Sequence, residues 1–181
     1  KAIKNAMERI DLASPLEAKL IKAMYLLYDQ ASIPDSDIRD RAYLGAMRRL
    51  NKEFPKDPDI AALYAASYMS IGRWDYWDSE GNPKSETMPV AEALEHIIHE
   101  DQSHPGVLHL HIHLIEASLE PERALVSADA LEATACTATV WPVPANSPEA
   151  VSPSPTLAEQ ERICRELEST SGSFQRLRLV M

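Results

Sequence analysis

Residues 103–118 read SHPGVLHLHIHLIEAS, and the backbone that this stretch adopts decides the fold class. Read as a strand, residues 108–114 alternate apolar residues with histidine, which would place three imidazoles on one face as ligands of a metal ion. Read as a helix, the same stretch puts His109 and His113 one turn apart, with Glu116 on the same face.

The flanking residues favour the helix. Ser103 is a capping residue and Pro105 suits the first position of a helix, where proline loses no hydrogen bond. A second helix start follows at Pro121, with apolar residues at helical spacing behind it. We therefore predict a helical hairpin over roughly residues 104–133, with the strand as the alternative.

Composition excludes several classes of protein. The 181-residue chain has a net charge of −10, which argues against nucleic acid as a partner. No run of about 18 apolar residues occurs, so we expect no membrane span. Cys136 and Cys164 are too few and too far apart for a disulfide framework or a thiolate zinc site, which indicates a reduced, cytoplasmic protein. The chain begins at Lys1 without an apolar leader, and we interpret it as part of a longer protein.

The composition changes near Glu132. Residues 1–131 carry 14 basic and 22 acidic residues and many helix-forming apolar residues, whereas five prolines fall between Pro142 and Pro155. A segment so rich in Pro, Ser and Ala buries too little apolar surface to offset the entropy of ordering it. We predict a helical domain over residues 1–132, a linker over 133–156 and a largely disordered tail over 157–181 that contains one short helix.

A repeated start signal organises the helical domain. A polar residue followed by proline begins a predicted helix at Ser14-Pro15, Asp57-Pro58 and His104-Pro105, and these starts are 43 and 47 residues apart. Hairpins at such a period cannot bury their apolar faces alone and have to stack. We therefore predict an all-α right-handed superhelix of stacked hairpins.

Apolar residues at helical spacing mark the other helices, over residues 2–12, 14–29, 36 or 37 to 53 and 60–69, the last closed by Gly72, and a further helix opens at residues 87–90. The stripe of the third of these consists of Tyr43, Ala46, Met47 and Leu50. Its basic residues fall largely on the opposite face and are predicted to be exposed: Arg39, Arg41, Arg48, Arg49 and Lys52.

Several segments resemble a large group of tetratricopeptide-repeat domain proteins, in which they recur in the same order. They are RWDYWD at 73–78, GNP at 81–83, HPG at 104–106, His113 with EAS at 116–118, and PERAL at 121–125. The resemblance covers roughly residues 14–131. It implies an α–α superhelix that serves as a scaffold for protein–protein contacts, with no established catalytic activity.

The resemblance ends after Leu131. In the group, the hairpin continues into a His-rich segment that begins with Gly-His-Leu, and then into further repeats. Either this chain is naturally truncated, or its tail comes from an altered reading frame or splice form. In both cases we expect an exposed apolar end face on the stack.

Two sets of residues are candidates for a functional site. The first is the aromatic loop Trp74, Asp75, Tyr76, Trp77 and Asp78. We predict that its aromatic rings anchor the loop in the seam between two hairpins, and the alternative is a stacking platform for a peptide or ligand. The two aspartates are predicted to accept hydrogen bonds from backbone donors within the loop.

The second set is the helical face formed by His109, His113 and Glu116, which could present two imidazoles and a carboxylate to one divalent metal ion. A water molecule, Asp75 or Asp78 would complete the site. The alternative is that these histidines only pack against neighbouring helices. His111 points away from both and is predicted to be a plain surface or groove residue.

No nucleophile and base stand together in the sequence, and its five glycines form no phosphate loop. The predicted function is a non-catalytic scaffold that binds a protein or peptide in a concave groove. The alternative is a metal-binding protein or a metal-dependent hydrolase.

Overall fold

The computed structural model describes residues 2–137. The chain divides into two compact units, Lys1–Leu131 and Glu132–Met181; the sites described below lie in the first, and the last described helix, α7, runs from the first into the second. The elements of the described residues are α1 (Ala2–Glu8), η1 (Ile10–Leu12), α2 (Pro15–Tyr28), α3 (Ser36–Glu53), α4 (Pro58–Gly72), α5 (Thr87–Glu100), α6 (Pro105–Ile115), η2 (Pro121–Ala124) and α7 (Leu125–Thr137).

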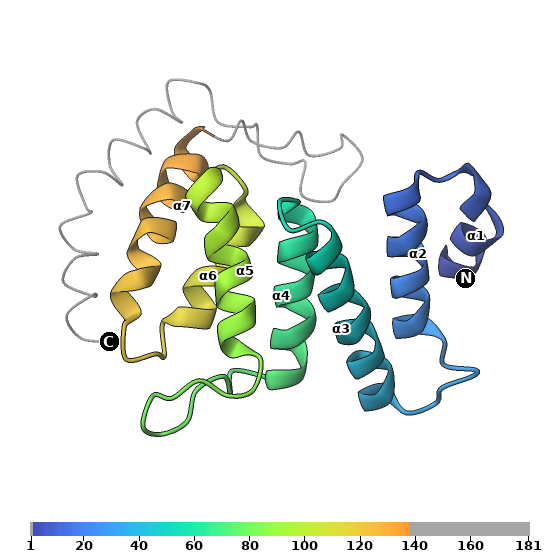
Figure 1. Ribbon diagram of the computed structural model, residues 1–181, viewed down its shortest axis with the longest axis horizontal. Coiled ribbons are helices and arrows are strands. Elements are labelled where there is room, and N and C mark those ends of the chain that lie inside the picture. Colours follow the sequence, from blue (N-terminus) through green and yellow to red (C-terminus); the bar gives the residue numbers. More distant parts are fainter. Residues whose placement is uncertain (1, 138–181) are drawn as a thin grey trace, which may run out of the picture. The chain divides into compact units, whose positions relative to one another are not determined.

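The prediction of an all-α fold is confirmed for the part of the chain that the structure describes. Residues 105–115 form α6, so the strand alternative is wrong. Successive helices pack as antiparallel neighbours, α2 with α3, α4 with α5, and each pair with the next (Figure 1). Helix α4 also contacts α6, the first helix of the following hairpin. No described helix has both the length and the apolar character that crossing a membrane requires.

The three repeated helix starts use the same capping geometry. In each, the side chain before the proline accepts a hydrogen bond from the backbone N–H three residues later, which satisfies one of the free donors at the helix start. The pairs are Ser14 with Glu17 at 3.3 Å, Asp57 with Ile60 at 3.0 Å, and His104 with Val107 at 3.1 Å.

The third cap differs from the prediction. His104 caps α6, through its Nδ1 atom, and Ser103 does not. Because Pro105 occupies the first helical position, the capping residue is the one directly before it. The opposite ring nitrogen, Nε2, lies 3.1 Å from Asp59 on α4 and so links the starts of two consecutive hairpins.

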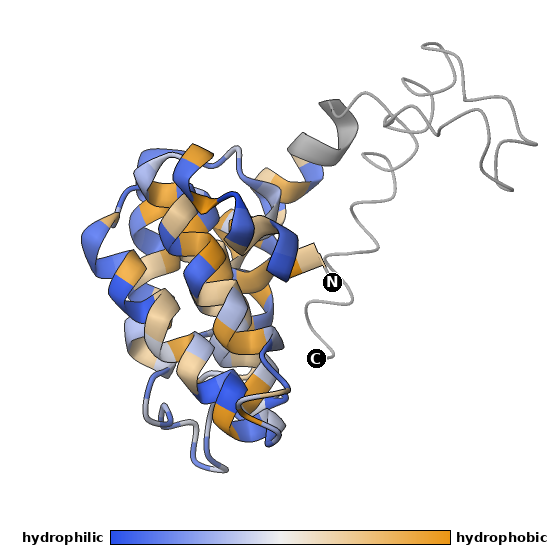
Figure 2. Ribbon diagram, turned by 90° about the vertical axis from the view of Figure 1, so that its right-hand side faces the viewer, coloured by the Kyte–Doolittle hydropathy of each residue, from blue (hydrophilic) through white to orange (hydrophobic). Residues whose placement is uncertain are grey.

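One apolar core runs through the unit, from Ala23 on α2 to Ala124 in η2. The predicted stripe of α3 is buried, as are Ala61 and Ala65 of α4, which are fully inaccessible and let neighbouring helices approach closely. Figure 2 shows hydrophobic and hydrophilic residues alternating along the helices, while the connecting loops are largely hydrophilic. This is the pattern of helices that are buried on one side.

Arg39 is an exception to the predicted exposure of the basic face of α3. Its side chain is buried, with Nε donating to the carbonyl of Leu27 and Nη1 donating to those of Ile33 and Pro34. The turn between α2 and α3 leaves carbonyls without helical partners, and the guanidinium supplies the donors. The pattern of polar and apolar residues along α3 cannot predict the burial of Arg39, because the carbonyls that it binds lie in another segment.

The C-terminal part of the described chain also differs in detail. The start at Pro121 gives a 3-10 turn, η2, before α7 begins at Leu125. Helix α7 continues to Thr137, past residue 133 where the linker was predicted to begin, because Ala133, Thr134 and Ala135 extend an alanine-rich helix. The rest of the predicted linker and the predicted tail lie outside the described residues.

Candidate interaction site

The loop between α4 and α5, residues 73–86, is held by a buried hydrogen-bonded chain. The hydroxyl of Tyr68 lies 2.7 Å from that of Thr87, which donates to the carbonyl of Tyr76, also at 2.7 Å. Tyr76 is buried, and its ring lies so close to Gly72 that a Cβ there would be 2.7 Å from a ring carbon. Burial raises the pKa of the Tyr76 hydroxyl, which donates to the Met69 carbonyl.

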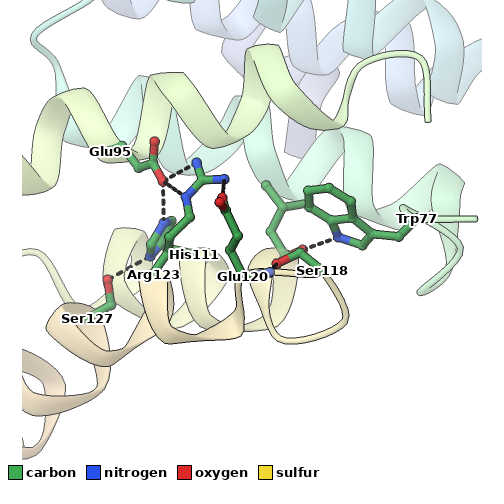
Figure 3. Close-up of polar contacts among 8 residues, drawn as sticks. Trp77, Glu95, His111, Ser118, Glu120, Arg123 and Ser127 are labelled. Atoms are coloured by element: carbon green, nitrogen blue, oxygen red, sulfur yellow. Dashed lines mark hydrogen bonds and ion pairs between the residues drawn. The ribbon is translucent and has the colours of Figure 1, made fainter. Parts of the chain in front are cut away.

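Trp77 ties the same loop to the next hairpin. Its indole Nε1–H donates to the carbonyl of Leu114 on α6 at 2.7 Å (Figure 3). Trp77 therefore anchors the loop between hairpins, as predicted, whereas the hydrogen bonds of Tyr76 hold the loop to α4 and α5 of its own hairpin.

Trp74 does not follow that prediction. Its side chain is 62% exposed, although an indole of this size normally gains most by burial. Its backbone φ is 74°, and the preceding Arg73 has a φ of 46°. Left-handed conformations are unfavourable for bulky residues, at a cost on the order of 1 kcal/mol or more each. The loop thus holds the indole in place although both its exposure and its left-handed backbone are unfavourable.

The exposed indole lies against the helical face that carries the histidines. The rings of Trp74 and His113 are edge to face with centroids 4.9 Å apart, and those of His113 and His109 are likewise edge to face at 4.6 Å. His113 Nδ1 lies 3.1 Å from a carboxylate oxygen of Glu116, and because a carboxylate only accepts, this nitrogen carries the proton. We call Trp74, His109, His113 and Glu116 the Trp74 patch.

The structure thus joins two sets that are far apart in the sequence. One member of the aromatic loop, Trp74, and all three members of the histidine face form a single surface. Tyr76 and Trp77 lie beneath it as anchors.

The two aspartates of the loop have different roles. Asp78 caps the turn as predicted, accepting from the backbone N–H groups of Glu80 and Asn82 and from the Asn82 amide. These hydrogen bonds, those from Asn82 foremost, hold the pKa of the Asp78 carboxyl below its usual value. Asp75 does not cap a backbone donor; it forms an ion pair with Lys84 across the loop.

The structure places the predicted metal ligands close together, but the described residues show no complete set of ligands for a metal ion. Within residues 2–137, no three His, Cys, Asp or Glu side chains form a group suited to a metal ion. His109 and His113 do lie on one face, and Glu116 is bonded to the second of them. Metal binding at these residues stays a prediction.

A second polar cluster, which we call the Glu95 network, lies between α5, α6 and the segment that follows (Figure 3). His111 is 1% exposed, with Nδ1 2.9 Å from the hydroxyl of Ser127 and Nε2 3.3 Å from a carboxylate oxygen of Glu95. Arg123 donates twice to the same oxygen, at 2.6 and 3.1 Å. Because Glu95 only accepts, Nε2 carries the imidazole proton and Nδ1 accepts from Ser127.

This network corrects the prediction that His111 is a plain surface or groove residue, because its ring is buried and hydrogen-bonded through both nitrogens. Burial, the largest effect, lowers the pKa of His111, while the hydrogen bond that the ring donates to Glu95 opposes the shift. The helical face opposite His109 and His113 is not exposed, because α5 and the first turns after Pro121 cover it.

A serine, a histidine and a glutamate that are joined one to the next by hydrogen bonds form an arrangement typical of nucleophilic catalysis. An open cavity of about 300 Å³ lies beside Glu95, His111 and Arg123, but Ser127 is fully buried and is not part of its lining. The hydroxyl therefore has no access to a substrate in this arrangement, and the network joins helices.

Sequence reasoning missed the Glu95 network because its members come from four elements. The resemblance had already pointed to the PERAL segment that contains Arg123, but no pattern in the chain links it to Glu95 or Ser127. Comparisons with family models, with curated proteins and with solved structures find no match for the chain.

Proposed function

We propose that this chain is a helical-repeat scaffold of the tetratricopeptide kind that binds a protein or peptide at the Trp74 patch. Three hairpin starts with one capping geometry and helices that pack in chain order support the scaffold part of this proposal. The observation that carries the binding part is Trp74.

Two features of Trp74 are unfavourable for the isolated chain, its 62% exposure and its left-handed backbone. Backbone outliers that the surrounding structure maintains are concentrated at functional sites. Tryptophan is also enriched among the few residues that supply most of the energy of protein interfaces. A partner that covers the indole would recover the apolar burial that the free chain lacks.

Neighbouring side chains hold the indole of Trp74 in place, which suits it to this role. Tyr76 lies behind Trp74, with ring centroids 6.4 Å apart, and His113 contacts it from α6. Tyr76 is itself held by its burial, and the loop that carries Trp74 is held by Trp77. An anchor that is held in place before binding loses little conformational entropy when a partner arrives.

Selection of a random library of short displayed peptides on the full chain tests the proposal. We expect enriched peptides whose affinity falls by about tenfold or more in Trp74→Ala. Tyr28→Ala is the matched control, because Tyr28 is an exposed aromatic residue on α2 and belongs to no part of the patch. Peptides that bind wild type and Trp74→Ala equally well would refute the proposal.

A further inference from the structure

A second exposed apolar residue lies where loop 73–86 meets the end of α6. Leu119 is 73% exposed, yet it lies directly over Gly81 of the loop, where an added Cβ would be 2.3 Å from the leucine Cγ. Gly81 has a φ of 80° and needs to be glycine for both reasons. Trp74 and Leu119 thus both flank the contact between the loop and the segment after α6, residues 116–123. We call these two segments the loop junction.

The loop junction is acidic. Its two segments hold seven acidic and three basic residues. Two of the basic residues are engaged within the protein, Lys84 with Asp75 and Arg123 with Glu95. Among the described residues, no lysine or arginine forms an ion pair with the following acidic residues of the junction: Asp78, Glu80, Glu116 and Glu122.

We infer that the partner of this surface is a positively charged peptide segment that places an apolar side chain against Trp74 or Leu119 and lysine or arginine against the surrounding carboxylates. This inference rests on the proposed function and names the chemical class of its partner. An acidic partner would meet uncompensated like charge, which disfavours the encounter, while a basic partner is steered toward the surface. A guanidinium or ammonium group can also lie over the exposed face of an indole.

The charge of the peptides selected on the full chain tests this inference. We expect enriched peptides to carry net positive charge, and their affinity to fall as salt concentration rises. A variant combining Glu80→Gln, Glu116→Gln and Glu122→Gln should weaken their binding by about threefold or more at low salt.

The matched control carries the same change in net charge elsewhere, at the exposed acidic residues Glu8, Asp11 and Glu92, as E8Q, D11N and E92Q. Equal weakening by both triple variants would show that only overall charge matters and would overturn the inference. Thermal unfolding of each variant, followed by circular dichroism, checks that the fold is intact.

The two proposals fail in different ways. Enriched peptides that need Trp74 but carry no positive charge would overturn the inference about the partner and leave the scaffold proposal standing. Peptides that bind without Trp74 would overturn both. Self-association of the full chain in sedimentation, lost in Trp74→Ala, would show that a second copy covers the surface and would also overturn the basic-peptide inference.

Discussion

Two substitutions of Trp74 measure how much its left-handed backbone lowers the stability of the fold. Trp74→Gly and Trp74→Ala both remove the indole with its contacts, but only glycine relieves the left-handed backbone at φ 74°. We expect Trp74→Gly to be more stable than Trp74→Ala by about 1 kcal/mol in urea unfolding. Equal stabilities would show that the backbone at this position is not strained.

His111 predicts a specific dependence of stability on pH. Its pKa in the folded protein lies below the ordinary value of 6.5, because burial disfavours the charged ring. Below that pH the unfolded chain binds a proton that the folded chain does not, so stability is full above pH 6.5 and falls as the pH drops through the lowered pKa. Unfolding free energies measured across this range should show the loss.

His111→Gln is the control for this dependence, since glutamine can hydrogen-bond but does not titrate. The difference in unfolding free energy between wild type and His111→Gln should narrow as the pH falls below 6.5. A difference that stays constant with pH would mean that His111 is not the titrating group.

At the scale of the element, the repeated caps predict matched effects on helix stability. Asp57→Ala removes the acceptor for the Ile60 N–H and should lower the free energy of unfolding by about 1 kcal/mol. Asp57→Asn keeps a capping oxygen and should cost much less. If both variants are equally unstable, charge rather than capping explains the role of Asp57.

Helix α6 also defines the test of the metal hypothesis, since all three predicted ligands lie on or next to it. We expect the full chain, purified without a His tag, to hold no stoichiometric zinc, manganese or iron, because no three His, Cys, Asp or Glu side chains of the described residues form a group suited to a metal ion. Stoichiometric metal that is lost in His113→Ala would refute the purely scaffolding role and support the metal-dependent alternative.

The positions of helices could be predicted because their signals are local. The capping residue, the proline and the apolar spacing of α2, α3, α4 and α6 lie within a few residues of one another. The role of Arg39 could not be predicted in this way, because its acceptors at Leu27, Ile33 and Pro34 belong to the preceding helix and turn. The choice of His104 over Ser103 as the cap, by contrast, follows from Pro105 at the first helical position and was within reach of the sequence.

At the scale of the whole molecule, the continuous core predicts cooperative unfolding. The buried residues from Ala23 to Ala124 form one cluster across the hairpins, and no hairpin buries its apolar face alone. We expect the full chain to lose its helical circular dichroism in a single sigmoidal transition on heating. A gradual loss without a transition would indicate that the hairpins do not depend on one another for stability.

The sequence by itself determined that the domain predicted over residues 1–132 is all-α, where the hairpins begin and which stripes face the core, since caps and apolar periodicity act over one or two turns. It also named the residues of the Trp74 patch, but as two separate sites. Only the tertiary structure decided that Trp74 lies outside on His113 while Tyr76 and Trp77 lie inside, and that His111 is buried with Glu95, Arg123 and Ser127. The physical reason is that exposure and hydrogen-bond partners depend on which helices pack together, and that packing joins residues separated by long stretches of chain.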